Sequence, residues 1–213
     1  MEFIDSKLQD YIEAHTEAES ALLAKLNRET HAKVLMPRML SGHLQGRVLA
    51  MLSHMISPKR ILEIGTYTGY SAICMAEGLA AGGSIDTIDI NEELETWLLG
   101  YFEEAGLADK IQLHIGDARQ IVTRLEGPYD LVFIDADKEN YSTYFDLVYD
   151  KVRTGGFVIA DNVLWSGKVV ATDKKIDKDT QALLDFNKKM HDDPRVENVL
   201  FPIRDGLMVL RKR

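Results

Sequence analysis

The spacing of hydrophobic residues divides the chain into two parts near residue 57. In the first part, apolar side chains recur at helical intervals; they are Leu40, Leu44, Val48, Leu52 and Met55. This spacing predicts a helix that buries the stripe and ends before Pro58, because proline cannot continue a helix. After residue 57 the apolar runs are short and separated by amphipathic segments. We therefore expect one domain over residues 1–213, with an N-terminal helical region at 1–57 and a core at 58–213.

The apolar runs of the second part contain few or no charged residues, as in strands that are covered on both faces. They occupy residues 60–64, 85–90, 111–115, 131–134 and 157–160. Helical periodicity fills the intervals at residues 68–80, 92–105, 118–125 and 141–152, and residues 179–191 are a further candidate helix. Alternation of strands and helices predicts right-handed crossovers and a doubly wound, parallel sheet.

The C-terminal segment follows a different pattern. Two runs rich in strand-forming residues, at 196–203 and 207–210, flank Arg204-Asp205-Gly206, and Asp-Gly between such runs is a hairpin signal. We expect an antiparallel pair at one edge of the sheet. Together these runs predict an α/β fold with a mostly parallel, seven-stranded, Rossmann-like sheet, an antiparallel C-terminal hairpin and N-terminal helices.

Composition narrows the class of protein. The chain has 213 residues, a formal net charge of -9 and a single cysteine, Cys74. The negative charge disfavours binding to a nucleic-acid backbone as the main activity. One cysteine cannot form an intramolecular disulfide, which suits a reducing compartment. Because no apolar run approaches the roughly 18 residues of a membrane span and the acidic start does not look like a signal peptide, we expect a cytoplasmic protein without a membrane partner.

A glycine-containing loop follows the first predicted strand. Gly65 and Gly69 lie between this strand and a helix, where open α/β sheets bind nucleotides. The loop lacks both the dinucleotide spacing and the phosphate-loop lysine, which favours a nucleoside without a phosphate cradle. A plain glycine turn is the alternative. Asp89 after the second strand is placed to accept ribose hydroxyls, and Asp117 after the third can meet an adenine amino group.

Oxygen-bearing side chains follow the next two predicted strands. Asp135 ends the fourth strand, and Asp161 with Asn162 ends the fifth. Adjacent parallel strands bring these residues to one rim, and three oxygen donors with two negative charges suit Mg²⁺ or Ca²⁺. Zinc and copper fit poorly, because the histidines are scattered. The alternative is structural, with Asp137 or Asp161 capping the following helix or turn.

Three segments together resemble a known family. They are Leu62-Glu63-Ile64-Gly65-Thr66-Tyr67-Thr68-Gly69-Tyr70-Ser71, then Phe133-Ile134-Asp135-Ala136-Asp137-Lys138-Glu139-Asn140-Tyr141, then Asp161-Asn162-Val163-Leu164-Trp165-Ser166-Gly167. From about residue 36 to the end, the chain resembles the caffeoyl-CoA and catechol O-methyltransferases, cation-dependent members of the class I methyltransferase fold. It departs from the plant members in its short N-terminal region and at Gln45-Gly46-Arg47.

The resemblance implies S-adenosyl-L-methionine as methyl donor and a divalent cation, Mg²⁺ or alternatively Ca²⁺ or Mn²⁺. The residues implied at the methionine end of the donor are Glu63, Gly65, Tyr67, Gly69 and Ser71. Asp89 would hold the ribose, Ala118 beside Asp117 would face adenine, and the backbone near Met36 would close over the donor. The implied metal ligands are Asp135, Asp161 and Asn162.

For catalysis, the resemblance implies Lys138 as general base, with Asp135 also touching the donor's amino group. Tyr141, Trp165 and Arg195 are candidates for the substrate rim. The implied reaction transfers a methyl group to a hydroxyl of a small ortho-dihydroxy aromatic molecule, such as a catechol or a caffeoyl compound. The resemblance also implies a homodimer.

Two other functions remain open at this point. One is methylation of a hydroxylated uridine in transfer RNA by the same chemistry. A basic cluster supports it; the cluster consists of Lys168, Lys174, Lys175, Lys178, Lys188 and Lys189. A solvated helix and loop face is the favoured explanation of these lysines. The other is a donor-binding protein without turnover, which would not need the set of Asp135, Lys138, Asp161 and Asn162.

Overall fold

The computed structural model describes residues 4–171 and 176–213. Within them, seven strands form one sheet in the order β3-β2-β1-β4-β5-β7-β6, with only β7 antiparallel to its neighbours. The strands are β1 (Arg60–Ile64), β2 (Ser84–Asp89), β3 (Ile111–Ile115), β4 (Tyr129–Ile134), β5 (Val152–Ala160), β6 (Val196–Phe201) and β7 (Leu207–Lys212). The predicted sheet and its edge hairpin are confirmed.

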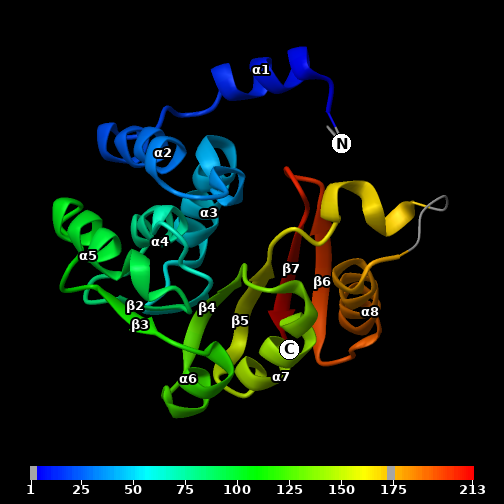
Figure 1. The fold of residues 1–213 in the computed structure, drawn as a ribbon. Helices are drawn as coiled ribbons and strands as arrows, with labels where there is room; N and C mark the ends of the chain where they lie inside the picture. The colour runs from blue at the N-terminus through cyan, green and yellow to red at the C-terminus, as the bar shows by residue number, and fades with distance from the viewer. Residues whose placement is uncertain (1–3, 172–175) are drawn as a thin grey trace.

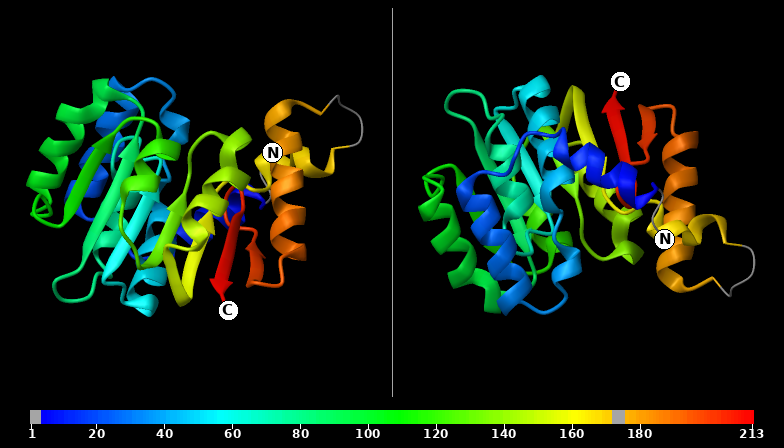
Figure 2. Two further views of the ribbon diagram at one scale, coloured as in Figure 1. Left: turned by 90° about the horizontal axis from the view of Figure 1, so that it is seen from below. Right: turned by 90° about the horizontal axis from the view of Figure 1, so that it is seen from above.

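Helices cover both faces of the sheet (Figures 1 and 2). On one face lie α2 (Ala21–Lys33), α3 (Gly42–Ile56), α4 (Tyr70–Ala76) and α5 (Glu95–Glu104). On the other lie α6 (Ala118–Arg124), α7 (Tyr141–Tyr149) and α8 (Lys178–Asp192). Each layer forms its own hydrophobic core against the sheet, and this burial of apolar surface on both sides is the main stabilising contribution.

Short one-turn segments connect these elements. They are η1 (Pro37–Met39), η2 (Glu92–Leu94), η3 (Lys138–Asn140) and η4 (Trp165–Val170). Two sequence predictions need correction here. The helix predicted at 141–152 ends at Tyr149, and Val152 already begins β5. Strand β3 is not covered on both faces: as an edge strand it buries Ile111 and leaves Gln112 exposed.

The fully buried face of α3 is shifted from the predicted stripe, of which Val48 and Leu52 are half-buried against the core. Met55 is 76% exposed, while Gln45, Gly46, Leu49, Ala50 and Ser53 are buried. The reason is close contact with α4: a Cβ atom on Gly46 would lie 2.6 Å from Cε1 of Tyr70. Small side chains let the two helices approach closely, and this contact overrides the apolar periodicity.

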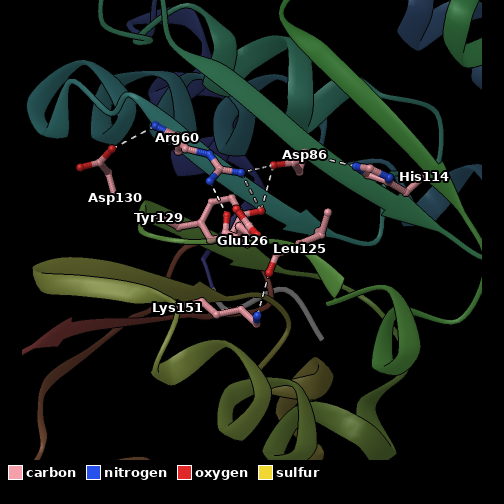
Figure 3. Close-up of polar contacts among 8 residues, drawn as sticks. All are labelled: Arg60, Asp86, His114, Leu125, Glu126, Tyr129, Asp130 and Lys151. Carbon is pink, nitrogen blue, oxygen red and sulfur yellow. Dashed lines mark hydrogen bonds and ion pairs between the residues drawn. The ribbon is translucent and has the colours of Figure 1, made fainter. Parts of the chain in front are cut away.

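A polar network lies at the ends where the parallel strands begin (Figure 3). The Arg60 guanidinium lies 2.9 Å from Asp86 Oδ2, which also accepts a 2.9 Å hydrogen bond from the Tyr129 hydroxyl. His114 Nε2 lies 3.0 Å from the other Asp86 oxygen. Burial would raise the pKa of Asp86, but hydrogen bonds from these three partners outweigh it and hold the pKa below its usual value.

Helix α1 (Ser6–Ala14) stands apart from both layers and has no buried residue. Seen from above, it crosses the ends of the central strands (Figure 2, right). Among the residues that the structure describes, no helix is both long and apolar enough to cross a membrane.

Candidate active site

The carboxyl ends of the parallel strands open into one cleft of about 1830 Å³. Its walls come from the loops after β1, β2, β3, β4 and β5, from the turn between β6 and β7, and from α1. This is the edge at which open α/β sheets bind ligands. Eleven of the residues predicted from the sequence line it; they are Met36, Gly65, Tyr67, Asp89, Asp117, Ala118, Asp135, Lys138, Asp161, Asn162 and Trp165.

The loop after β1 touches the end of β4 directly. Gly65 has a φ of 101°, and a Cβ atom there would lie only 1.9 Å from the carbonyl oxygen of Asp135. No other residue fits, because this φ favours glycine and the space is filled by backbone. Gly69, with a φ of 88°, begins α4. This close packing is a structural reason for glycine at position 65, so it fits the alternative of a plain glycine turn as well as a nucleoside site.

Glu63 lies under this loop and is completely buried. Its two carboxylate oxygens each accept a 2.5 Å hydrogen bond, from Ser71 Oγ and from Thr87 Oγ1. Burial raises the pKa of Glu63 to about 8, although the two hydroxyl groups oppose the shift, and the charges of Asp135 and Asp89 add to it. A cationic group bound in the cleft would favour the charged form of Glu63 and so lower this raised pKa.

Asp89 is held in place by main-chain groups. It accepts hydrogen bonds from the Tyr67 nitrogen at 2.6 Å and from the Asn91 nitrogen at 2.8 Å. The next residue, Ile90, lines the cleft and is 77% exposed, an unusual position for a large apolar side chain. The sequence analysis missed Ile90 because it reads as the end of a strand. Ile90 follows Asp89, the residue predicted to bind the ribose, so its apolar side chain could pack against the face of the donor's adenine base.

Asp117 and Ala118, which follow β3, line the cleft beyond Asp89. Asp117 caps α6 through the Arg119 nitrogen at 2.9 Å, and it also pairs with the Arg119 guanidinium at 2.8 Å. The hydrogen bonds from Arg119 hold the pKa of Asp117 below its usual value. Its carboxylate is therefore already occupied, and Ala118 leaves space beside it. Contact of either residue with adenine stays a prediction.

A buried lysine pairs with Asp135 and connects to the main chain of Asp161 through Tyr141. Lys138, only 7% exposed, lies 3.0 Å from Asp135 Oδ1 and donates to the Tyr141 hydroxyl at 2.6 Å. The Tyr141 hydroxyl in turn donates to the Asp161 carbonyl oxygen at 3.0 Å. This chain of contacts joins the ends of β4 and β5. The residues Asp135, Lys138, Asp161 and Asn162 are thus brought together as predicted.

Asp161 is 2% exposed, and both of its carboxylate oxygens are anchored. Oδ1 accepts from the Asn162 nitrogen at 2.6 Å, and Oδ2 accepts from Gln45 Nε2 at 2.5 Å. Burial raises the pKa of Asp161 to about 7, and the charge of Asp135 adds to the shift. The sequence analysis did not identify Gln45 as a site residue.

Of the three residues predicted at the substrate rim, only Trp165 lines the cleft. Lys138 and Lys168 lie 5.8 and 5.3 Å from the centre of its ring. Tyr141 is fully buried beneath Lys138, so it supports the lysine and does not face the cleft.

Arg195 is not at the rim. It pairs with Asp193 and lies 4.3 Å over the Tyr149 ring, beside the start of β6. Because the far end of β6 leads to the cleft, Arg195 lies at the opposite end of the sheet. The sequence could not show this, since it does not give the direction of the last strands.

Three of the six lysines of the basic cluster pair with acidic side chains. Lys168 pairs with Asp177, Lys188 with Asp192 and Lys189 with Asp146. Lys174 and Lys175 lie outside the described residues. The paired lysines fit the solvated-face interpretation, and no observation here favours an RNA acceptor.

Backbone strain is concentrated at the cleft. In the described part of the chain, seven residues other than glycine have a positive φ. Six of them line the cleft; they are Met36, Tyr67, Asn162, Trp165, Ser166 and Arg204. Such conformations cost about 1–3 kcal/mol each and cluster at functional sites. Arg204, with a φ of 48°, also donates from Nη1 to the Leu40 carbonyl oxygen at 2.9 Å.

The chain is similar in sequence to a known family and to named plant enzymes. A family described as O-methyltransferase matches residues 13–213. Caffeoyl-CoA O-methyltransferase 2 of Eucalyptus globulus is 39% identical over 196 residues, covering 87% of this chain and 79% of that protein. Caffeoyl-CoA O-methyltransferase 5 of Nicotiana tabacum is 37% identical, covering 87% and 82%.

Solved structures agree with the sequence comparison. The SAH-bound methyltransferase PaMTH1 of Podospora anserina has a TM-score of 0.90 at 28% identity, covering 98% of this chain and 94% of that chain. An O-methyltransferase of Bacillus cereus, in complex with SAH, has a TM-score of 0.89 at 27% identity, covering 97% of each chain.

Proposed function

This chain belongs to the O-methyltransferase family and is a S-adenosylmethionine-dependent enzyme, and from that premise we propose that it methylates a hydroxyl of a catechol-like aromatic molecule with the help of a divalent cation. The observation that supports this most is the shared floor of the cleft, where Asp135 and Asp161 lie on either side of the buried ammonium of Lys138. Two carboxylates and one ammonium leave a net negative charge there.

The side chains at this floor fit a hard cation. In the described residues, no three His, Cys, Asp or Glu side chains are grouped closely enough to hold a metal, so the third protein donor would be the Asn162 amide oxygen. Asn162 has a φ of 59°, a left-handed conformation that asparagine tolerates, and its side chain makes no hydrogen bond among these residues. Asp135, Asp161 and Asn162 would hold the ion, with its other positions left for water or acceptor.

A neutral phenol is a poor nucleophile near neutral pH, because its pKa lies near about 10. A bound divalent cation would stabilise the acceptor's oxygen as it loses its proton. Lys138 is the base candidate: its Nζ lies between Asp135 and Tyr141, and it can accept a proton only as a neutral amine. Positive charge bound at Asp135 would weaken the hold of that carboxylate on the Lys138 side chain.

The remaining residues position the reactants. The glycine loop, Asp89 and the residues after β3 lie on one side of the acidic pair, where the donor would bind. Trp165, Lys168 and Arg204 line the other side, where the acceptor would bind. Methyl transfer from sulfur to oxygen requires in-line approach, so holding both reactants across the β4–β5 rim should supply much of the acceleration.

The test is methyl transfer from S-adenosylmethionine to catechol, caffeate, caffeoyl-CoA and a 5-hydroxyuridine nucleoside, each with Mg²⁺ or with excess chelator. We expect methylation of at least one catechol-type acceptor that stops in chelator and returns with added Mg²⁺. Methylation that continues in chelator would refute the cation. Activity on the nucleoside alone would favour the RNA function.

The homodimer stays a prediction. Met51 and Met55 on the outer face of α3 are 61% and 76% exposed, and they are the apolar positions that a second copy would cover. Light scattering of the purified protein tests it: a mass near twice the 24.0 kDa of the chain supports the dimer, and a mass near 24.0 kDa refutes it.

A further inference from the structure

Gln45 occupies a place where a polar side chain is costly. It is 1% exposed, on the face of α3 that packs against the sheet. Its Oε1 is buried and has no hydrogen-bond partner among residues 4–171 and 176–213. An unpaired buried polar atom destabilises the folded state, so an apolar residue of similar size would stabilise this helix contact better. The glutamine therefore needs another explanation.

The amide's other half makes a single contact, to the functional carboxylate. Gln45 Nε2 donates to Asp161 Oδ2 at 2.5 Å across 116 residues of sequence. The Asn162 nitrogen binds Oδ1 at 2.6 Å. With one donor on each oxygen, the Asp161 carboxylate cannot rotate about its last bond. Each oxygen still has a lone pair, because a carboxylate offers about four acceptor positions.

The charge of the side chain at this position matters as much as its shape. A lysine would pair with Asp161 and compete with a divalent cation for the carboxylate. A glutamate would add a third negative charge and would accept hydrogen bonds only. An apolar residue would leave Oδ2 without its donor. A neutral amide fixes the carboxylate and leaves the charge of the Asp135, Lys138 and Asp161 group unchanged.

We propose that Gln45 is a positioning residue that orients the Asp161 carboxylate for the divalent cation. This inference rests on the proposed function. Groups that hydrogen-bond a metal ligand set its direction, and their loss typically lowers metal affinity by about 10–100-fold. Gln45 lies on α3, in the layer of helices that also contains α2, α4 and α5. A shift of α3 would therefore move the amide that orients Asp161 and would change the proposed cation site.

The experiment measures Mn²⁺ binding directly, by electron paramagnetic resonance, on the donor-free protein. Gln45→Met keeps the length of the side chain and removes the donor. We expect its Mn²⁺ dissociation constant to rise roughly 10-fold or more, while SAH affinity by calorimetry stays within about twofold, since the donor-side residues are untouched.

The matched control is Ser53→Ala: Ser53 lies on the same buried face and donates to the Met75 carbonyl oxygen at 2.6 Å, away from the cleft. It should lose stability but keep Mn²⁺ affinity.

A second variant covers the case in which Gln45→Met does not fold. Gln45→Glu keeps size and polarity but places a third carboxylate beside Asp161. Its melting temperature should fall without a cation and rise more on Mn²⁺ addition than that of the wild type. Unchanged Mn²⁺ affinity in a folded Gln45→Met, or an unchanged Mn²⁺-induced shift in Gln45→Glu, would overturn the inference. A wild type that does not bind Mn²⁺ would instead refute the cation in the proposed function.

Discussion

The two ends of the central sheet handle buried charge in opposite ways. At the end shown in Figure 3, Asp86 is surrounded by Arg60, His114 and Tyr129, and its pKa is lowered. At the cleft, Asp161 and Glu63 are buried more deeply with too few cations, and their pKa values are raised to about 7 and about 8. Acidic residues of one sheet therefore have different roles at its two ends. Asp86 belongs to a paired structural network, whereas Asp161 and Glu63 lack enough cationic partners and could interact with a bound ligand.

The backbone shows the same difference. Six of the seven left-handed residues other than glycine line the cleft, and the seventh, Ser57, follows α3 near the start of β1. Uncompensated charge and conformational strain both cost free energy, and here they coincide. Under the proposed function, negative side chains that lack full compensation would favour binding of the positively charged donor and of a cation, whereas a structural network is stable only if it is fully paired.

The largest expected effect is at the cleft. Asp161→Ala should reduce methyl transfer roughly 1000-fold, because a cation contributes several kcal/mol to stabilising charge in the transition state. The melting temperature should stay equal or rise, since the change removes a buried charge that lacks full compensation. Steady-state kinetics with a calorimetric scan checks both. A strongly destabilised variant would show that Asp161 is structural like Asp86.

Lys138→Ala comes next. A general base typically contributes about 10²–10⁴-fold, so turnover should fall at least roughly 100-fold while the KM for the donor changes little. Lys188→Ala, which removes an exposed lysine paired with Asp192 on α8, is the control and should behave as wild type. Equal losses in turnover and donor affinity would argue against the base role.

Asp86→Asn tests the opposite end. The change leaves the Arg60 guanidinium without its carboxylate, and partial exposure limits the loss to about 2 kcal/mol, or a fall of about 4–8 °C in melting temperature. Activity below that temperature should be unchanged. Because the folded-state pKa of Asp86 is lowered, the wild type's advantage should be complete above its ordinary pKa of 3.8 and disappear as the pH falls further.

Replacing Glu63 with glutamine should change stability with the opposite pH dependence to that of Asp86→Asn. The raised pKa of Glu63 means that its contribution to stability is complete below 4.5 and is lost as the pH rises through about 8. In urea melts of the donor-free protein, the variant should be close to wild type at pH 4 and more stable at pH 8.5. A variant that is less stable at both values would mean that the Ser71 and Thr87 hydrogen bonds outweigh burial.

The smallest effect concerns strain. Arg204→Gly should relieve the positive φ and so stabilise the protein by up to about 1 kcal/mol, offset in part by the greater freedom of glycine in the unfolded chain and by loss of the contact to Leu40. A melting temperature within a few degrees of wild type, on the higher side, is expected. A large loss would show that the guanidinium contact outweighs the strain.

The sequence predicted those cleft residues whose position follows from the strand that precedes them. Asp89, Asp135 and Asp161 each follow an apolar run, and parallel strands place such residues at one edge. Gln45 was not predictable, because its contact depends on which face of α3 is buried, and the small residue Gly46 sets that face against Tyr70. Arg195 was misplaced for a similar reason: the order and direction of β6 and β7 are tertiary properties that no local pattern contains.

The turn between β6 and β7 has a consequence for engineering new acceptor preferences. Asp205 accepts from the Ser166 nitrogen through its side chain and from the Leu164 nitrogen through its carbonyl, and the Gly206 carbonyl accepts from the Val163 nitrogen at 3.1 Å. The segment after β5 and this turn therefore form one unit. A chimera that imports either segment alone from a relative would break these bonds, so successful exchange requires transplanting both segments from the same parent.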